Sequence, residues 1–278
     1  MCDKDIILSY SEFSKDTTSY GINSGNKRNE IFYEKIGWCP FCNRQAMQQV
    51  SMSENYKTNF GPMRELIEQV WQCTCGWWQI YYYSHLDDGD SWKDWEIYVY
   101  NAQLKKFNIG ARQVPIKILR DYLESHYDRI CDINDKKMEE LVAAVFREHY
   151  SCEVIEVGKS HDGGVDLLLV NSDCPTIIQV KRRRTSAKTE SVKEIRDLLG
   201  ATMLFGSSKC IFVTTADHFS PDAINSRNIA ISKKIVDSFE LYDYNSFFDL
   251  VQLHKNETIA PWVQLLRFEQ DLKCKVQL

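Results

Sequence analysis

The sequence has no long apolar segment, and this absence excludes one class of protein. No apolar run approaches the roughly 20 residues that a membrane-spanning helix needs, although 44% of the 278 residues are hydrophobic. The N-terminal residues MCDKDIILSYSEFSK also lack a basic region followed by an apolar stretch, so we expect no signal peptide. The sequence therefore predicts a cytoplasmic globular protein that does not associate with a membrane.

An excess of positive charge is also missing. The chain has 34 Lys and Arg residues against 39 Asp and Glu residues, for a net charge of -5, which argues against a uniformly basic nucleic-acid-binding protein. Binding depends, however, on where the positive charge lies. One cluster concentrates it: Lys181, Arg182, Arg183, Arg184 and Lys188. Such a run is either a solvated surface or a set of contacts to phosphate.

The ten cysteines do not predict a disulfide framework in a cytoplasmic chain. Four of them are spaced as metal ligands, in Cys-Pro-Phe-Cys and Cys-Thr-Cys-Gly: Cys39, Cys42, Cys73 and Cys75. Four thiolates suit the tetrahedral coordination of structural zinc. We interpret this region as a zinc ribbon with flanking strands over residues 31–36 and 77–83, the alternative being four unrelated buried thiols.

Aromatic residues cluster around the second cysteine pair. They are Trp71, Trp77, Trp78, Tyr81, Tyr82, Tyr83, Trp92 and Trp95. Such side chains can stack on nucleic-acid bases, or they can cover a small ribbon that has little core of its own. We favour the second interpretation.

The chain divides into three parts by composition. Residues 1–30 are polar and show no sustained periodicity, so we expect a loosely ordered arm with one short strand at 6–10. Residues 31–132 form the zinc-ribbon domain and end in a connecting helix that begins near Ile116. Residues 133–278 follow the order helix, hairpin, helix, strand, helix, strand, helix, which predicts an α/β domain with a mixed central sheet.

The helices and strands of this last part have clear sequence signals. An apolar stripe predicts a helix over 136–150, and further helices are expected at 191–204, 221–228 and 245–254, with strands at 209–214 and near 242. Glu139 lies at the edge of the first helix's buried face. Its carboxylate either meets a partner from the hairpin or interacts with the helix N-terminal dipole.

The predicted hairpin carries the residues with the most distinctive chemistry. Its two strands cover Val165–Val170 and Ile177–Val180, and Gln179 and Lys181 should share one face because side chains alternate along a strand. Asp166 could reach the same face. A carboxylate and an amide oxygen suit Mg²⁺, and a lysine can stabilise an attacking hydroxide. Alone, this pattern is also compatible with an ordinary hairpin.

Five elements in order make the pattern specific. They are MEELV from Met138, DGGVDLLL from Asp162, IIQVKR from Ile177, RDLLGA from Arg196, and FVTT from Phe212 followed by Phe219-Ser220. Over residues 136–252, the sequence resembles the Mrr-type restriction endonuclease domain, a branch of the PD-(D/E)XK nucleases. The resemblance implies a restriction-endonuclease-like mixed sheet flanked by helices, which here follows a small β-rich zinc ribbon domain.

The resemblance also implies roles for individual residues. Asp166 and Gln179 correspond to ligands of Mg²⁺ or Mn²⁺, Lys181 to the motif lysine and Glu139 to the helix glutamate. Glutamine at position 179 is typical of the Mrr branch, and its neutrality weakens the case for two metal ions. The adjacent basic cluster is then expected to contact DNA phosphates.

The function predicted from the sequence is metal-dependent cleavage of DNA, in a prokaryotic restriction or anti-phage defence role that rests on family association alone. The alternative is a non-catalytic DNA-binding or sensor subunit of a multiprotein defence system. A third interpretation is a docking module that uses the ribbon and its aromatic residues. A homodimer is expected if both strands of a duplex are cut.

Overall fold

The computed structural model describes residues 5–21, 35–57, 63–87, 93–157, 164–170, 174–253 and 259–267. The chain forms two compact units. The first, here called the α/β unit, contains Met1–Ile7 and Phe107–Thr258, and the second, the β unit, contains Leu8–Lys106 and Ile259–Leu278. In the described part of the chain, no helix is both long enough and apolar enough to span a membrane.

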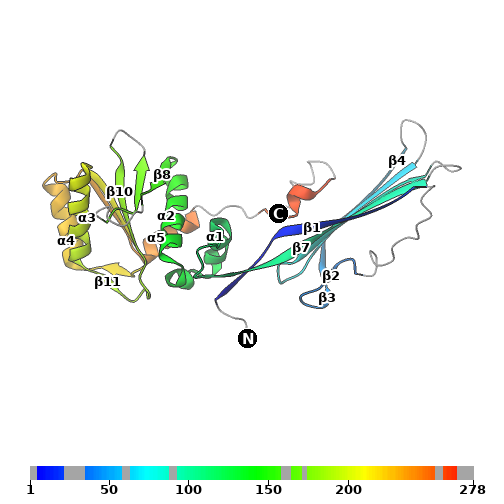
Figure 1. Ribbon diagram of the computed structural model, residues 1–278, viewed down its shortest axis with the longest axis horizontal. Coiled ribbons are helices and arrows are strands. Elements are labelled where there is room, and N and C mark those ends of the chain that lie inside the picture. Colours follow the sequence, from blue (N-terminus) through cyan, green and yellow to red (C-terminus); the bar gives the residue numbers. More distant parts are fainter. Residues whose placement is uncertain are drawn as a thin grey trace. The chain divides into compact units, whose positions relative to one another are not determined.

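A mixed five-stranded sheet forms the centre of the α/β unit (Figure 1). Its strand order is β14-β12-β10-β9-β8, with β8 at Glu153–Glu156, β9 at Leu167–Val170, β10 at Thr176–Lys181, β12 at Lys209–Thr214 and β14 at Ser238–Tyr242. Strands β10, β12 and β14 run parallel, and β9 is antiparallel to both of its neighbours. The mixed sheet predicted from the sequence is confirmed.

Helices cover both faces of this sheet (Figure 1). Three lie on one side: α1 at Ile116–Ser125, α2 at Asp135–Tyr150 and α5 at Tyr244–Leu253. Two lie on the other: α3 at Val192–Phe205 and α4 at Pro221–Ser232. The chain also forms a 3-10 helix, η2, at Tyr127–Asp132, and a short parallel pair of β11 (Thr189–Glu190) with β13 (His218–Phe219).

Helix α2 illustrates how the sequence specifies these elements. The Asn134 side chain caps its first turn by accepting a hydrogen bond from the backbone N–H of Lys136 at 3.0 Å, as N-terminal caps do. Its apolar stripe is fully buried, including Leu141, Val142 and Phe146. Burial of each such side chain contributes about 1.5–3 kcal/mol, which fixes the helix on the sheet and places Glu139 beside the hairpin.

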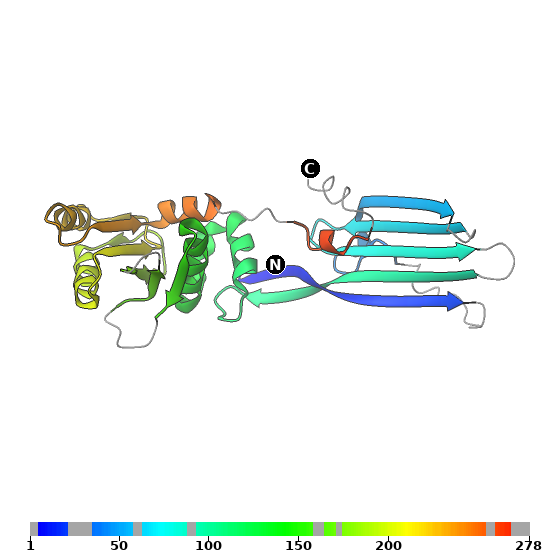
Figure 2. The same ribbon diagram turned by 90° about the horizontal axis from the view of Figure 1, so that it is seen from above.

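The β unit is built on one antiparallel sheet, seen from above in Figure 2. Its strand order is β1-β7-β6-β5-β4, with β1 at Ile6–Gly21, β4 at Met47–Lys57, β5 at Met63–Gln72, β6 at Trp78–Asp87 and β7 at Lys93–Asn108. A small hairpin of β2 (Trp38–Cys39) and β3 (Arg44–Gln45) carries the first cysteine pair. A short 3-10 helix, η3, lies at Val263–Leu265.

Both faces of this sheet bury aromatic and apolar side chains. One face packs Trp78 and Tyr100 against Trp262 and Val263 of the returning C-terminal segment. The other face buries Tyr81, Ile97 and Val99. The clustered aromatics are thus mainly core, as the favoured interpretation expected; Trp92 lies outside the described residues.

The unit boundaries differ from those drawn from the sequence. Residues 107–132 belong to the α/β unit because Val114 and Leu119 are fully buried in its core. Residues 259–278 belong to the β unit, where Trp262 is buried.

The N-terminal region also differs from the expected arm. Residues 6–21 of the predicted arm at 1–30 form strand β1, whose backbone pairs with β7. Of the strand predicted at 31–36, residues 31–34 lie outside the described part and Lys35–Gly37 form a turn.

Candidate active site and cysteine cluster

The predicted hairpin forms and brings Asp166 beside the end of β10. Strands β9 and β10 pair Leu168 with Ile177 and Leu167 with Ile178, and Asp166 directly precedes β9. The backbone N–H of Asp166 donates to the Ile178 carbonyl at 3.0 Å. Since the Asp166 carboxylate also accepts a hydrogen bond from the N–H of Val180, Asp166 lies beside residues 178–180 of β10.

Gln179 has a buried oxygen without a hydrogen-bond donor. Its side chain is 8% exposed, and among the described residues nothing donates to its Oε1 atom. Gly164 makes the turn beside it with a φ of +90°, and a Cβ atom there would lie 3.2 Å from the Gln179 Nε2 atom. An unsatisfied buried acceptor costs about 1–3 kcal/mol. A ligand such as a cation would remove this cost.

The Asp166 carboxylate is held by the backbone of the next strand. Its Oδ2 atom accepts a hydrogen bond from the N–H of Val180 at 2.8 Å. Burial raises the pKa of Asp166, and the Val180 hydrogen bond and the charges of Lys136 and Lys181 lower it, with a net upward shift. A carboxylate whose charged form is disfavoured by burial gains from binding a cation.

Glu139 approaches the same place from α2. Its carboxylate is largely buried and accepts a hydrogen bond from the Lys136 ammonium at 2.6 Å. Burial raises the pKa of Glu139, Lys136 lowers it, and the negative charges of Asp166 and Glu156 raise it further, with a net upward shift. The negative charge of Asp166 thus acts on Glu139, and the Lys136 ammonium lowers the pKa of both carboxyls. The oxygen atoms of Asp166, Gln179 and Glu139 are hard ligands of the kind that Mg²⁺ and Mn²⁺ prefer.

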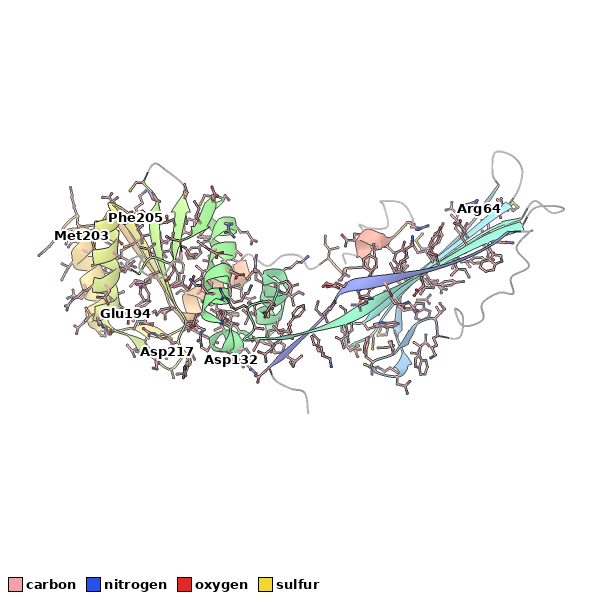
Figure 3. All side chains as sticks on the ribbon, viewed as in Figure 1. Arg64, Asp132, Glu194, Met203, Phe205 and Asp217 are labelled. Atoms are coloured by element: carbon pink, nitrogen blue, oxygen red, sulfur yellow. The ribbon has the colours of Figure 1, made fainter. Side chains whose placement is uncertain are left out.

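Lys181 ends strand β10 on the same face as Gln179. Its ammonium lies 3.5 Å from the Glu194 carboxylate of α3, and 37% of its side chain is exposed. Glu194 also lies 3.4 Å from the Arg183 guanidinium, and Figure 3 shows it on α3. Sequence reasoning missed Glu194, because the only local signal is an acidic residue in the first turn of a helix.

The basic cluster divides into two parts. Arg182 donates to the Asp135 carboxylate and, at 2.8 Å, to the Cys131 carbonyl, and Arg183 binds the Glu190 carboxylate through two hydrogen bonds of 2.7 and 2.5 Å. Arg184 and Lys188 are exposed, and neither forms an ion pair with another of the described residues. Of the residues predicted to contact DNA, Arg184 and Lys188 are therefore the two without an ion-pair partner among the described residues.

Glu190 anchors the segment that follows Lys181. It is fully buried, and besides Arg183 it accepts a hydrogen bond from the Thr214 hydroxyl at 2.6 Å. The Arg183 backbone N–H in turn donates to the Thr215 hydroxyl at 2.7 Å. These bonds fix the basic segment to the end of β12, so Lys181 leaves its strand in a defined direction.

In the β unit, the structure brings together the four predicted metal-ligand cysteines. The sulfur atoms of Cys39, Cys42, Cys73 and Cys75 all lie within 4.8 Å of one another. Four sulfurs at about 2.3 Å from one tetrahedral zinc ion would be about 3.8 Å apart. The cluster therefore fits a zinc ion and requires only small movements to hold it.

The backbone of each cysteine turn supports this arrangement. The N–H of Asn43 donates to the Cys39 carbonyl at 2.9 Å, and the N–H of Gly76 donates to the Cys73 carbonyl at 2.9 Å. Burial raises the pKa of the Cys73 thiol, but hydrogen bonds from the Cys75 backbone and from Arg44 lower it, to about 6 overall. A thiolate is the form that binds a metal.

Comparison with known proteins finds a family match within the α/β unit. Residues 130–251 match the family Mrr_cat, described as "Restriction endonuclease". A solved structure described as "Structure of EndoMS in apo form" is 10% identical, with a TM-score of 0.24 over 82% of this chain and 98% of that chain, a similarity too low to indicate a shared fold. No curated protein matches the sequence. Residues 130–251 thus match a restriction endonuclease domain, in agreement with the resemblance found in the sequence.

Proposed function

We propose that the protein is a cytoplasmic, metal-dependent DNA endonuclease that hydrolyses phosphodiester bonds. The observation that carries the proposal is the buried Gln179 oxygen without a donor, on the strand whose Val180 N–H holds the Asp166 carboxylate, in a domain that matches a nuclease family. A buried oxygen that binds a cation needs no hydrogen-bond donor from the protein.

Each residue has a distinct role in this proposal. Asp166, Gln179 and Glu139 hold one Mg²⁺ or Mn²⁺ ion, which supplies charge neutralisation at the phosphate when bound. Lys181 lies two residues after Gln179 on β10 and orients the attacking water by charge and hydrogen bonding. Gln179 is neutral, so only two carboxylates supply negative charge, which favours one ion over two.

A cleavage assay tests the proposal directly. Plasmid, linear and phage DNA, with and without base modification, are incubated with the purified chain and Mg²⁺ or Mn²⁺. We expect metal-dependent cleavage that Asp166→Asn and Lys181→Met each reduce by at least 100-fold, on the order of the effect of removing one electrostatic interaction from a transition state. Asp197→Asn, exposed on α3, and Lys233→Met, exposed at the end of α4, are matched controls that should cleave normally.

The assay also separates the two functions predicted from the sequence. A non-catalytic DNA-binding or sensor subunit would bind DNA and leave all substrates intact under every metal condition. That result would refute the endonuclease proposal. Cleavage that persists in both Asp166→Asn and Lys181→Met would refute the assignment of the site.

We further propose that the cleavage serves prokaryotic restriction or anti-phage defence. The support is the family of residues 130–251, described as a restriction endonuclease. Expression of the wild-type chain in a bacterial host should lower phage plating efficiency, whereas Asp166→Asn should restore it. Equal plating with both chains across a diverse phage panel would count against this role.

We also propose that the four-cysteine cluster holds one structural zinc ion and that two copies act together on duplex DNA. The support for zinc is the grouping of the four sulfurs. The support for the dimer is the need for two active sites to cut two strands. Sedimentation of the wild-type chain with a specific duplex should give a mass of two chains per DNA, and one chain per DNA would contradict the dimer.

A further inference from the structure

A cavity of about 430 Å³ lies within the β unit. It is open to solvent and is lined by residues 35–40 on one side and by Trp77 and strands β1, β6 and β7 on the other. The residues that matter for its chemistry are Asp16, Lys35, Trp38, Trp77, Gln79 and Asn101. Its volume falls in the range of about 300–1,000 Å³ that is typical of ligand pockets.

Two indole rings line this cavity. Trp77 is almost fully buried, whereas 41% of Trp38 is exposed. The Trp38 ring is held by a hydrogen bond from its Nε1 atom to the Asn43 side chain at 3.2 Å. Gly37 turns the chain just before it with a φ of +71°, and a Cβ there would lie 2.5 Å from the Trp71 ring. Trp38 therefore brings a partly exposed indole ring, held by a side-chain hydrogen bond, to the cavity.

A chain of hydrogen bonds orients the polar wall. The N–H of Gly37 donates to Gln79 Oε1 at 2.6 Å, and Gln79 Nε2 donates to Asn101 Oδ1 at 2.7 Å. Asn101 Nδ2 then donates to Asp16 Oδ2 at 3.4 Å. Among the described residues, none donates a hydrogen bond to the other Asp16 oxygen and none forms an ion pair with Lys35. The wall thus offers a carboxylate acceptor and a cation to a ligand.

We propose that this cavity binds an unstacked nucleobase of DNA and that it prefers guanine. A ring that stacks on Trp38 can present its edge to Asp16. Guanine has two adjacent N–H donors, N1–H and N2–H₂, on its Watson–Crick edge, which match a carboxylate better than the edges of the other three bases. Lys35 is placed to contact the neighbouring phosphate. Stacking together with readout of this edge is a known way to bind an unstacked base. The choice of DNA rests on the proposed function.

Binding of single-stranded oligonucleotides tests this inference. Fluorescence anisotropy measures the affinity of the zinc-loaded full chain for a labelled oligothymidine with one central G, A, C or T, with no magnesium or manganese added. We expect the tightest binding for the central G. Trp38→Ala should weaken that binding about tenfold, and Asp16→Asn should abolish the preference for G. Phe41→Ala, which removes a similarly exposed aromatic ring from the same turn, should bind as the wild type does.

The outcomes are decisive in both directions. Trp38→Phe keeps an aromatic ring and should retain the preference, which separates the loss of stacking from damage to the fold. Equal affinity for all four central bases, or wild-type binding by Trp38→Ala, would overturn the inference. A chain that prefers G but cuts no DNA with Mg²⁺ or Mn²⁺ would overturn only the proposed nuclease activity. A chain that cuts DNA without any base preference would overturn only the base-binding cavity.

Discussion

The Glu194 carboxylate lies 3.5 Å from the Lys181 ammonium, so the lysine of the candidate site is held by a residue of α3. The same carboxylate lies 3.4 Å from Arg183, which is itself bound to the buried Glu190. Lys181 is therefore linked to the interior of the α/β unit through charged side chains rather than pointing freely into solvent.

We expect Glu194→Gln to reduce kcat by about 10-fold to 100-fold with little change in KM, because Lys181 loses the partner that fixes its position. Steady-state cleavage kinetics measure both constants. Asp197→Asn, on the same helix and exposed, is the control. A change in KM alone would indicate that Glu194 affects DNA binding instead.

Asp166→Asn should stabilise the metal-free protein at pH 7. Burial raises the pKa of Asp166 and of Glu139, so for these groups the folded chain binds more protons than the unfolded chain above about pH 4. Their contribution to stability is therefore greatest at low pH and falls as the pH rises through the raised pKa values. An amide at position 166 removes the cost of a buried charge.

Thermal unfolding with and without Mg²⁺ checks this sign. The wild type should gain stability when Mg²⁺ is added, because a ligand that binds only the folded state stabilises it. Asp166→Asn should start from a higher Tm and respond much less to the ion. A lower Tm for the metal-free variant would show that the charged carboxylate stabilises the fold.

Arg183→Ala should destabilise the α/β unit by about 3–5 kcal/mol, because it leaves the buried Glu190 carboxylate without its cation. Glu190 is fully buried and forms two hydrogen bonds with Arg183. Urea unfolding followed by circular dichroism gives the free energy. Arg184→Ala, at an exposed position, should change it by less than about 0.5 kcal/mol; equal effects of the two variants would contradict the role of the buried pair.

Replacement of Arg184 or Lys188 by alanine should weaken DNA binding without changing sequence preference. Both residues are exposed. If each side chain neutralises one phosphate of duplex DNA, each replacement should reduce the slope of log affinity against log salt by about 0.9. Binding isotherms at four salt concentrations measure the slope. An unchanged slope in the double variant would place the DNA-binding surface elsewhere.

Cys42→Ser should lower the zinc content from one ion per chain and destabilise the β unit, since a structural zinc site contributes directly to folding. Metal analysis by mass spectrometry and near-ultraviolet circular dichroism of the buried tryptophans are the measurements. Cys152→Ser, in the α/β unit, should keep its full zinc content. If neither variant lost zinc, the proposed metal site would be refuted.

The α/β unit was largely predictable because its signals are local. The apolar stripe of α2, the Ser220-Pro221 start of α4 and the continuous apolar run of β12 each correspond to an observed element. Asp166 could be placed near the end of β10 because a hairpin brings its two strands side by side. Glu194 could not be predicted as a site residue, since nothing in the sequence places the start of α3 beside the end of β10.

The β unit was harder to predict for a physical reason. Strand β1 contains many Ser, Thr, Lys and Asp residues, and most of its described side chains beyond Tyr10 are exposed. Strand β4 is likewise mostly exposed. Edge strands of this kind are held by backbone pairing with a neighbouring strand. Their sequences therefore show no alternating hydrophobic pattern from which a strand could be predicted. The return of Trp262 to the β unit depends on tertiary packing alone.

The return of the C-terminal segment to the β unit limits how the protein can be truncated or recombined. The chain passes between its two units three times, after Ile7, after Lys106 and after Thr258. A single cut or one recombination point therefore cannot exchange either unit for another. A stop codon directly before Trp262 would leave every residue of the candidate site in place and would still remove part of the β unit's core. Damage at the 3′ end of the gene would therefore affect the unit that includes most of the N-terminal part of the chain.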